Sequence, residues 1–212
     1  MDRFENLAKT CETRTLPAYV WQVFEIDHTN TSWLQDQPHA EPYIALKQTP
    51  LVLKGIHINH HLYGATHVAL LAATLGLNNE RDLRAYNAIS TVDGMIYSAC
   101  ASSLIEEAAD RANAEIEDAA HACGFYTTWR FSPGYGDLPL DIQAEFVRTL
   151  QAQKALGLSV TPSNLLIPTK SITAIIGLFP SKPSTTDESP CTICPTRFSC
   201  SYQEKGITCH GR

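Results

Sequence analysis

The sequence lacks an apolar run long enough to cross a membrane. The longest run is VALLAATLGL, residues 68–77, and it is interrupted by Thr74 and Gly76. A membrane-spanning helix needs about 20 apolar residues. The opening residues, MDRFENLAKTCETRT, also lack the apolar core and the small-residue cleavage site of a signal peptide. We therefore expect a soluble, cytoplasmic protein.

Clusters of basic residues are missing as well. The chain has 16 Lys and Arg against 22 Asp and Glu, so its formal net charge is -6. Nucleic acids and anionic membrane surfaces attract basic patches, and we expect neither as a partner. The nucleophile elbow GxSxG, the P-loop and the GxGxxG fingerprint are absent too, which leaves no signature of a common hydrolase or nucleotide-binding fold.

What remains is the composition of a globular domain, with 44% hydrophobic and 18% charged residues. A chain of 212 residues can bury a core without disulfides or metals. We divide it into a domain at 1–180, a linker at 181–190 (SKPSTTDESP) and a Cys-rich segment at 191–212.

Apolar periodicity predicts the secondary structure of the first 180 residues. The expected strands are 19–26, 50–58, 164–168 and 171–178, and the expected helices are 60–77, 81–122 and 138–156. Asp137 is a candidate N-cap for the last helix, and Gly157 is its candidate stop. Thr169 and Lys170 leave open a hairpin between the last two strands.

The segment RFSPGYGDLP, residues 130–139, has the features of a rigid turn. Pro133 fixes one backbone dihedral, and Gly134 and Gly136 permit positive φ and close approach to a ligand. Such a turn would hold Tyr135 in place, and Arg130 can offer a planar fork to a carboxylate. From these residues alone, an ordinary loop between helices and a binding site for a small zwitterion both remain open.

The motif RxSPGY is followed by a helix and then by SVTPSNLLIPTKSITAIIG, and LLAATLGLNNERDLRAY lies upstream. In this order the segments resemble the activation domain of cobalamin-dependent methionine synthase, in a stand-alone form, over roughly residues 40–180. The matching residues are Arg130, Pro133, Gly134 and Tyr135 in the first motif and Thr161, Ser163, Pro168, Ser171 and Thr173 in the second.

The resemblance implies an α+β fold with helices packed on a twisted, mostly antiparallel sheet. It also implies an accessory subunit that binds S-adenosylmethionine and docks on a corrinoid methionine synthase, or on a related methyltransferase. The cobalamin sits on that partner. A flavodoxin-like or ferredoxin-like donor supplies an electron, so that cob(II)alamin is reductively remethylated. The protein supplies positioning for chemistry that belongs to the cofactor.

The resemblance also assigns roles to residues. Arg130 would bind the ligand's carboxylate, and the backbone at Ser132, Pro133 and Gly134 would hold its polar end. Tyr135 would act as the catalytic residue that closes the site near the sulfonium or the corrin. The family places an acidic residue of the long helix at the ligand's ammonium group. Asp93 is the acidic residue nearest to the matching positions, Tyr97 and Ala101.

The Cys-rich segment has the spacing C-x2-C-x5-C-x8-C, formed by Cys191, Cys194, Cys200 and Cys209. Thiolates at short spacing suit an iron–sulfur cluster or a zinc ion, and reduced thiols without a metal are the third alternative. A cluster would fit electron delivery to cobalt. It leads to an alternative function, an iron–sulfur redox protein or binding partner for another corrinoid methyltransferase.

Two further groups of polar residues have plainer interpretations. His57, His60, His61 and His67 favour a solvated helix start over a metal site. The acidic residues of the long helix, Glu106 and Asp110 among them, favour a solvated face over paired catalytic carboxylates.

Overall fold

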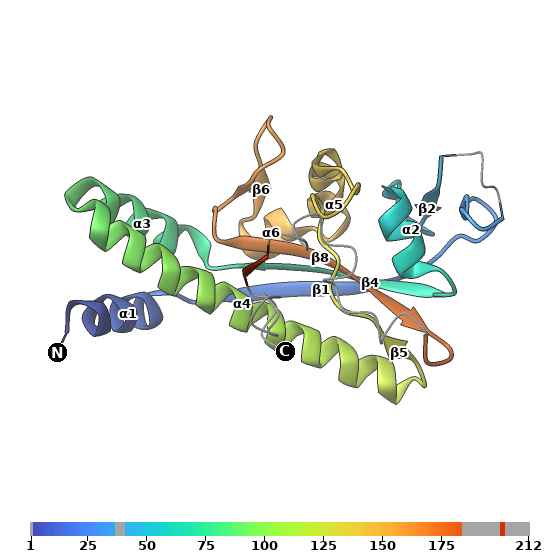
Figure 1. Cartoon of the computed structure of the whole chain (residues 1–212), viewed down its shortest axis with the longest axis horizontal. Coiled ribbons are helices and arrows are strands. Elements are labelled where there is room, and N and C mark those ends of the chain that lie inside the picture. Colours follow the sequence, from blue (N-terminus) through green and yellow to red (C-terminus); the bar gives the residue numbers. More distant parts are fainter. Residues whose placement is uncertain (1, 37–40, 184–199, 202–212) are drawn as a thin grey trace.

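The computed structural model describes residues 2–36, 41–183 and 200–201 of the chain (Figure 1). Its helices are α1 (Arg3–Arg14), α2 (Ile56–Leu62), α3 (Gly76–Ile89), α4 (Thr91–Ala122), the short 3-10 turn η1 (Leu140–Ile142), α5 (Gln143–Thr149) and α6 (Ala152–Leu156). Its strands are β1 (Ala18–Glu25), β2 (Tyr43–Ala45), β3 (Val52–Lys54), β4 (His67–Thr74), β5 (Tyr126–Thr127), β6 (Ser159–Val160), β7 (Leu166–Ile167) and β8 (Ser171–Phe179).

One antiparallel sheet organises the molecule, with strand order β1-β4-β8-β5. The long helix α4 runs along one face of this sheet, and α2, α5 and α6 lie on the other side (Figure 1). The fold is therefore α+β, with helices packed on a mostly antiparallel sheet. This confirms the expected fold class.

The central strand β4 separates two apolar cores. Val68, Leu70 and Ala72 belong to the core that also contains residues of α2 and α5. Ala69 and Leu71 belong to the core against α4. Successive side chains of a strand point to opposite faces, so one strand that is apolar at every position can serve both cores.

The predicted helix at 60–77 is wrong, because its central part is strand β4, and only the ends of the segment belong to helices α2 and α3. Ala and Leu have high helix propensity, and this favoured a helix for VALLAATLGL. A short, continuous apolar run is equally compatible with a strand that is buried on both faces. In the fold, β4 lies between β1 and β8, and all of its residues except His67 are buried.

The predicted single helix at 81–122 is two helices. The chain breaks at Ser90, where the backbone is extended (φ -154°, ψ 117°), and the Ser90 hydroxyl accepts a hydrogen bond from the Asp93 N–H. An N-cap serine starts a new helix in this way. The predicted helix at 138–156 is likewise divided into η1, α5 and α6, with Gln151 at φ 50°. Gly157 ends it as predicted, in the left-handed region.

The remaining strand predictions have mixed outcomes. Strand 19–26 is confirmed as β1, and strand 171–178 is confirmed as β8. Segment 50–58 contains only β3 before α2 begins at Ile56. In segment 164–168, β7 pairs with β6, and no hairpin joins β7 to β8 among the described pairings.

Candidate functional site

The predicted motif lies in a segment that extends the edge strand β5. Thr128 donates its N–H to the Gly177 carbonyl (3.1 Å), and Phe131 and Ile175 exchange backbone hydrogen bonds (2.9 and 2.8 Å). Residues 126–131 thus run along β8 and place the motif at the edge of the main sheet. Sequence reasoning missed this register because β5 itself has only two residues.

A buried histidine of α2 fixes this segment. His61 Nε2 lies 3.1 Å from the Trp129 carbonyl and 3.1 Å from the Thr128 hydroxyl, and its ring packs on Trp129 and Phe131 at centroid distances of 4.3 and 5.2 Å. Burial away from water lowers the pKa of His61 to about 4, although the Trp129 carbonyl offsets part of this effect. The ring is therefore neutral at pH 7. It has a structural role that the solvated-histidine interpretation did not foresee.

The residues Ser132–Tyr135 form a tight turn. The Tyr135 N–H donates to the Ser132 carbonyl (3.0 Å), and Gly134 has φ 93°. Proline at the second position and positive φ at the third are typical of a type II turn. Pro133 is buried, whereas Tyr135 is 48% exposed and its ring meets Phe131 edge-on at 6.3 Å. The predicted rigid turn is confirmed.

The turn continues into a contact with α2. A Cβ on Gly136, which has φ 54°, would lie 2.3 Å from His57 Nδ1. Asp137 accepts hydrogen bonds from the N–H groups of Ile56 (2.6 Å) and His57 (3.0 Å). Asp137 was predicted to cap the helix that follows it, but it satisfies the free N–H groups of α2 instead. The capping chemistry was correct and the partner helix was wrong.

Arg130 points toward α4. Its guanidinium donates to Asp110 (2.7 Å) and to Glu106 (3.2 Å). Trp129 and Phe131 both pack on His61, and the alternation of side chains along extended backbone sends Arg130 to the opposite side. Tyr135 lies with Phe131. Arg130 and Tyr135 thus lie on opposite faces at the edge of the sheet. The structure does not bring them together, although both were predicted to bind one ligand.

Glu106 and Asp110 are the site residues that sequence reasoning missed. They lie four residues apart on α4, so they share one face of the helix. That spacing was visible in the sequence, but the partner, Arg130, lies 20 residues beyond Asp110 and meets it only in the folded chain. Both carboxylates are well exposed, at 62% and 72%, whereas Arg130 is 20% exposed.

Asp93 lies apart from this group. It is in the first turn of α4 and pairs with Arg3 of α1 (2.6 Å). Seventeen residues of helix separate it from Asp110, which corresponds to roughly 25 Å at about 1.5 Å per residue. The structure therefore does not bring Asp93 to Arg130, although both were predicted to bind one ligand.

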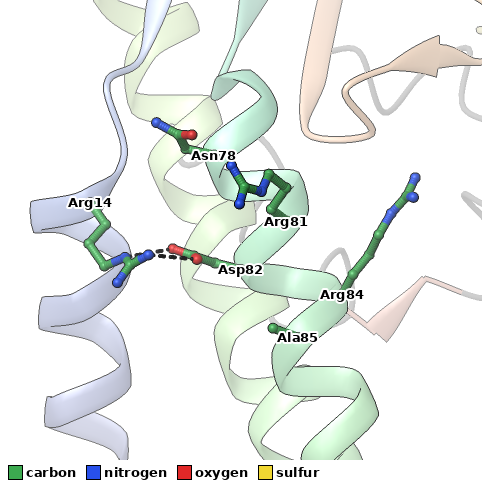
Figure 2. A pocket seen from close by; sticks show the side chains of 6 residues that line it. All are labelled: Arg14, Asn78, Arg81, Asp82, Arg84 and Ala85. Carbon is green, nitrogen blue, oxygen red and sulfur yellow. Dashed lines mark hydrogen bonds and ion pairs between the residues drawn. The ribbon is translucent and has the colours of Figure 1, made fainter.

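Two hollows lie near these elements. One, of about 590 Å³, borders the motif at Asp137 and Pro139 and is walled by Tyr43, Lys54 and Ile56, among others. The other, of about 450 Å³, lies at α1 and α3, where Arg14 makes a bidentate ion pair with Asp82 (Figure 2). In Figure 2 the Arg84 side chain points away from this pair.

Three of the four predicted metal ligands, Cys191, Cys194 and Cys209, lie outside the described residues. Cys200 is half-buried and not in a disulfide. Within residues 2–36, 41–183 and 200–201, no group of His, Cys, Asp or Glu is arranged to hold a metal ion. No helix in the same ranges is long and apolar enough to span a bilayer.

Residues around Arg130 combine complementary charges in one place. The guanidinium can bind a carboxylate, and the exposed carboxylates of Glu106 and Asp110 can bind an ammonium group. An aromatic ring and a rigid turn lie at the same edge of the sheet. This set of groups fits the two charges of a free amino acid or of an amino-acid derivative.

Comparisons with known proteins agree with this fold. The crystal structure of the MetH reactivation domain bound to AdoHcy superposes on the chain with a TM-score of 0.54 and 17% sequence identity. The match covers 96% of this chain and 73% of that one. No protein-family model matches the sequence, and a search of curated proteins found no match. The chain therefore has the fold of a methionine synthase reactivation domain.

Proposed function

We propose that this chain binds S-adenosylmethionine beside Arg130 and docks on the corrinoid domain of a methionine synthase, or of a related methyltransferase, to support its reductive reactivation. The observation on which the proposal depends most is the meeting of Arg130 with Glu106 and Asp110, next to the Ser132–Tyr135 turn. The fold likeness to a reactivation domain that binds AdoHcy, the demethylated form of S-adenosylmethionine, supports it.

Binding would proceed by exchange of ion pairs. Glu106 and Asp110 are exposed, and ion pairs of exposed groups are weak, about 0–1 kcal/mol. The ligand's carboxylate can therefore replace one of them on Arg130. The displaced carboxylate then receives the ligand's ammonium group. We assign the ammonium-binding role to Glu106 and Asp110, because the structure places Asp93 far from Arg130.

The turn would present Tyr135 to the partner. Ser132, Pro133 and Gly134 fix the backbone, and Phe131 supports the exposed ring of Tyr135. Because Tyr135 lies on the face opposite Arg130, we assign its ring to contact with the partner's corrin and not with the sulfonium. S-adenosylmethionine would supply the methyl group, the partner's cobalamin would supply the cobalt, and a flavodoxin-like or ferredoxin-like protein would supply the electron. This chain would bind and orient the ligand.

Calorimetric titration of the full chain with S-adenosylmethionine tests the binding. Removing a charged hydrogen-bonding partner costs about 1.5–3 kcal/mol, so we expect Arg130→Ala to weaken binding at least about tenfold. Glu106→Gln should weaken it less, because Asp110 remains. Arg81→Ala is the matched control, since Arg81 is an exposed arginine of α3. Equal affinity of wild type and Arg130→Ala would contradict the assigned site.

A second assay tests the docking. The protein is added to a corrinoid methionine synthase without its own activation domain, and the recovery of activity from the cob(II) state is followed with an electron donor present. We expect faster recovery with the wild type than with Tyr135→Ala. Unchanged recovery on adding wild type would remove the docking part of the proposal, even where the ligand binds.

The Cys-rich segment stays a separate proposal. Cys191, Cys194, Cys200 and Cys209 would hold an iron–sulfur cluster or a zinc ion, and a cluster would favour the redox alternative. These residues lie largely outside the described part of the chain, so their spacing in the sequence is the support for this assignment.

A further inference from the structure

One edge of the main sheet, strand β1, has backbone groups that point away from the sheet. The Ile26 N–H donates to the Thr66 carbonyl, next to β4. Because the direction of the backbone N–H and C=O groups alternates along a strand, those of residues 20, 22 and 24 also point toward β4. The odd-numbered residues point the other way. Glu25 does so, and its carbonyl accepts from the Lys47 N–H (2.9 Å).

Tyr19, Trp21 and Val23 also point their backbone groups to this outer side. None of the backbone hydrogen bonds of the described residues reaches them from there. Each residue has one N–H donor and one C=O acceptor. Within residues 2–36, 41–183 and 200–201, the backbone groups on the outer edge of β1 therefore have no hydrogen-bonding partner over residues 19–23.

Nothing in the sequence of β1 protects this edge. Natural edge strands avoid pairing with other chains through Lys, Pro, bulges or a covering element. The strand AYVWQVFE contains no Lys, Pro or Gly. Its single charge, on Glu25, is paired with Lys47 Nζ at 2.6 Å, and Val23 is 39% exposed.

The strand is also held in a fixed conformation. The Tyr19 hydroxyl and the Trp21 indole N–H both donate to Glu115 of α4, at 2.5 and 3.3 Å. All eight residues of β1 are in register with β4. A strand that is already ordered loses little conformational entropy when it gains a neighbour.

We propose that a second copy of this chain pairs with β1 through its own β1, antiparallel, about a two-fold axis at Trp21. The free groups lie symmetrically about Trp21, so each copy offers the donors and acceptors that the other needs. Tyr19 then faces Val23 of the second copy, an aromatic and β-branched pair that stabilises antiparallel strands. The uncharged side chains of residues 18–24 set no like charges opposite each other.

The position of this interface separates it from the proposed ligand site. The sheet order β1-β4-β8-β5 puts β1 and the 126–131 segment on opposite edges. In the dimer both Arg130 sites stay open, and the dimer does not depend on what they bind. Each copy has a net charge of -6, so added salt should strengthen association by screening the repulsion.

Sedimentation equilibrium of the full chain tests the proposal, with reductant present to exclude disulfide-linked species. The chain has a mass of 23.4 kDa, so the dimer has 2 × 23.4 = 46.8 kDa. We expect the mass to rise from the first value to the second with concentration, and at lower concentration when salt is added. A single mass of 23.4 kDa up to millimolar protein would overturn the proposal.

The variant Val23→Pro tests whether the dimer forms through the backbone of β1. It removes an N–H that faces away from β4, so the ladder between β1 and β4 stays intact. We expect at least about a tenfold weaker dimer, because the N–H is lost on both copies. Val23→Ala, which shortens the side chain and keeps the N–H, is the control, and circular dichroism checks the folding of both variants. Undiminished dimerisation of a folded Val23→Pro would refute the β1 interface.

Amide hydrogen exchange gives an independent measurement on the wild type. The amides of Tyr19, Trp21 and Val23 should become protected as the dimer forms. Those of Val20, Gln22 and Phe24 should already be protected in the monomer by β4. A dimer in which the first three amides exchange as fast as in the monomer would use another surface, and this would also refute the proposal.

Discussion

At the scale of single residues, charge and hydrogen bonding depend on neighbours that are remote in the sequence. Arg130 meets Glu106 and Asp110, and Asp93 meets Arg3 instead of the proposed ligand site. His61 is the strongest example, since it is buried and neutral between Trp129 and Thr128. A histidine in that position makes stability depend on pH.

We predict that the folded protein loses stability as the pH falls from about 6.5 to about 4. His61 has a pKa of about 4 when folded, against 6.5 for an unperturbed histidine, so only the unfolded state takes up the proton in this range. Stability therefore falls with pH. A difference of about 2.5 pKa units corresponds to roughly 3 kcal/mol. Urea denaturation at several pH values measures it.

His61→Gln is the control for this prediction. Glutamine can donate to the Trp129 carbonyl but does not titrate, so its free energy of unfolding should change less between pH 6.5 and 4. Both proteins contain the same carboxylates, so the contribution of these groups to the pH dependence of the free energy of unfolding is the same in both. If wild type and His61→Gln lost the same stability over this range, the assignment to His61 would be incorrect.

At the scale of secondary-structure elements, breaks between helices define the site as much as the helices do. Ser90 ends the continuity between α3 and α4, and its hydroxyl accepts from the Asp93 N–H (3.3 Å) and from Arg3 Nη2 (3.1 Å). This cap sets the start of α4 and fixes Arg3 of α1 beside it.

We predict that Ser90→Ala lowers the free energy of unfolding by about 1 kcal/mol, the usual cost of losing an N-cap. Ser103→Ala, at an exposed position of the same helix, is the control and should have almost no effect. Thermal unfolding followed by circular dichroism gives both values. A Ser90→Ala variant as stable as Ser103→Ala would show that the cap contributes nothing.

At the scale of the whole molecule, the sheet separates two cores and two edges. The α4 core and the α2–α5 core lie on its opposite faces. The Arg130 segment and β1 lie on its opposite edges. The Cys-rich segment at 191–212 follows this domain in the chain, and the metal proposed for it is to be sought in the complete protein.

We predict that the full chain, purified without oxygen, contains iron or zinc bound by the Cys-rich segment. Cysteines at short spacing bind these metals as thiolates. Elemental analysis gives the metal per chain, and absorbance near 400 nm distinguishes a cluster from zinc. Cys191→Ser with Cys194→Ser should lose the metal, whereas Cys123→Ser, an exposed cysteine elsewhere, should keep it. Metal-free wild type would leave these cysteines as unligated thiols.

The sequence by itself determined the features that depend on local chemistry. Pro133 and Gly134 favour a tight turn, Gly157 ends a helix, and the aromatic and β-branched residues of the 19–26 segment form strand β1. The order of motifs also predicted the α+β fold. The turn, the helix end and the strand follow from the preferences of a few adjacent residues, whereas the fold class was implied by the resemblance of the ordered motifs to a known family.

Only the tertiary structure decided the rest. Residues 68–74 of VALLAATLGL became part of β4 because burial on both faces of the sheet outweighed their helix propensity. Asp137 caps α2, and Glu106 and Asp110 hold Arg130, because the packing of α2 and α4 on the sheet brings these groups within hydrogen-bonding distance. Such contacts join residues 20 to 81 positions apart. Local propensity contains no information on them, since their energy exists only after the sheet has formed.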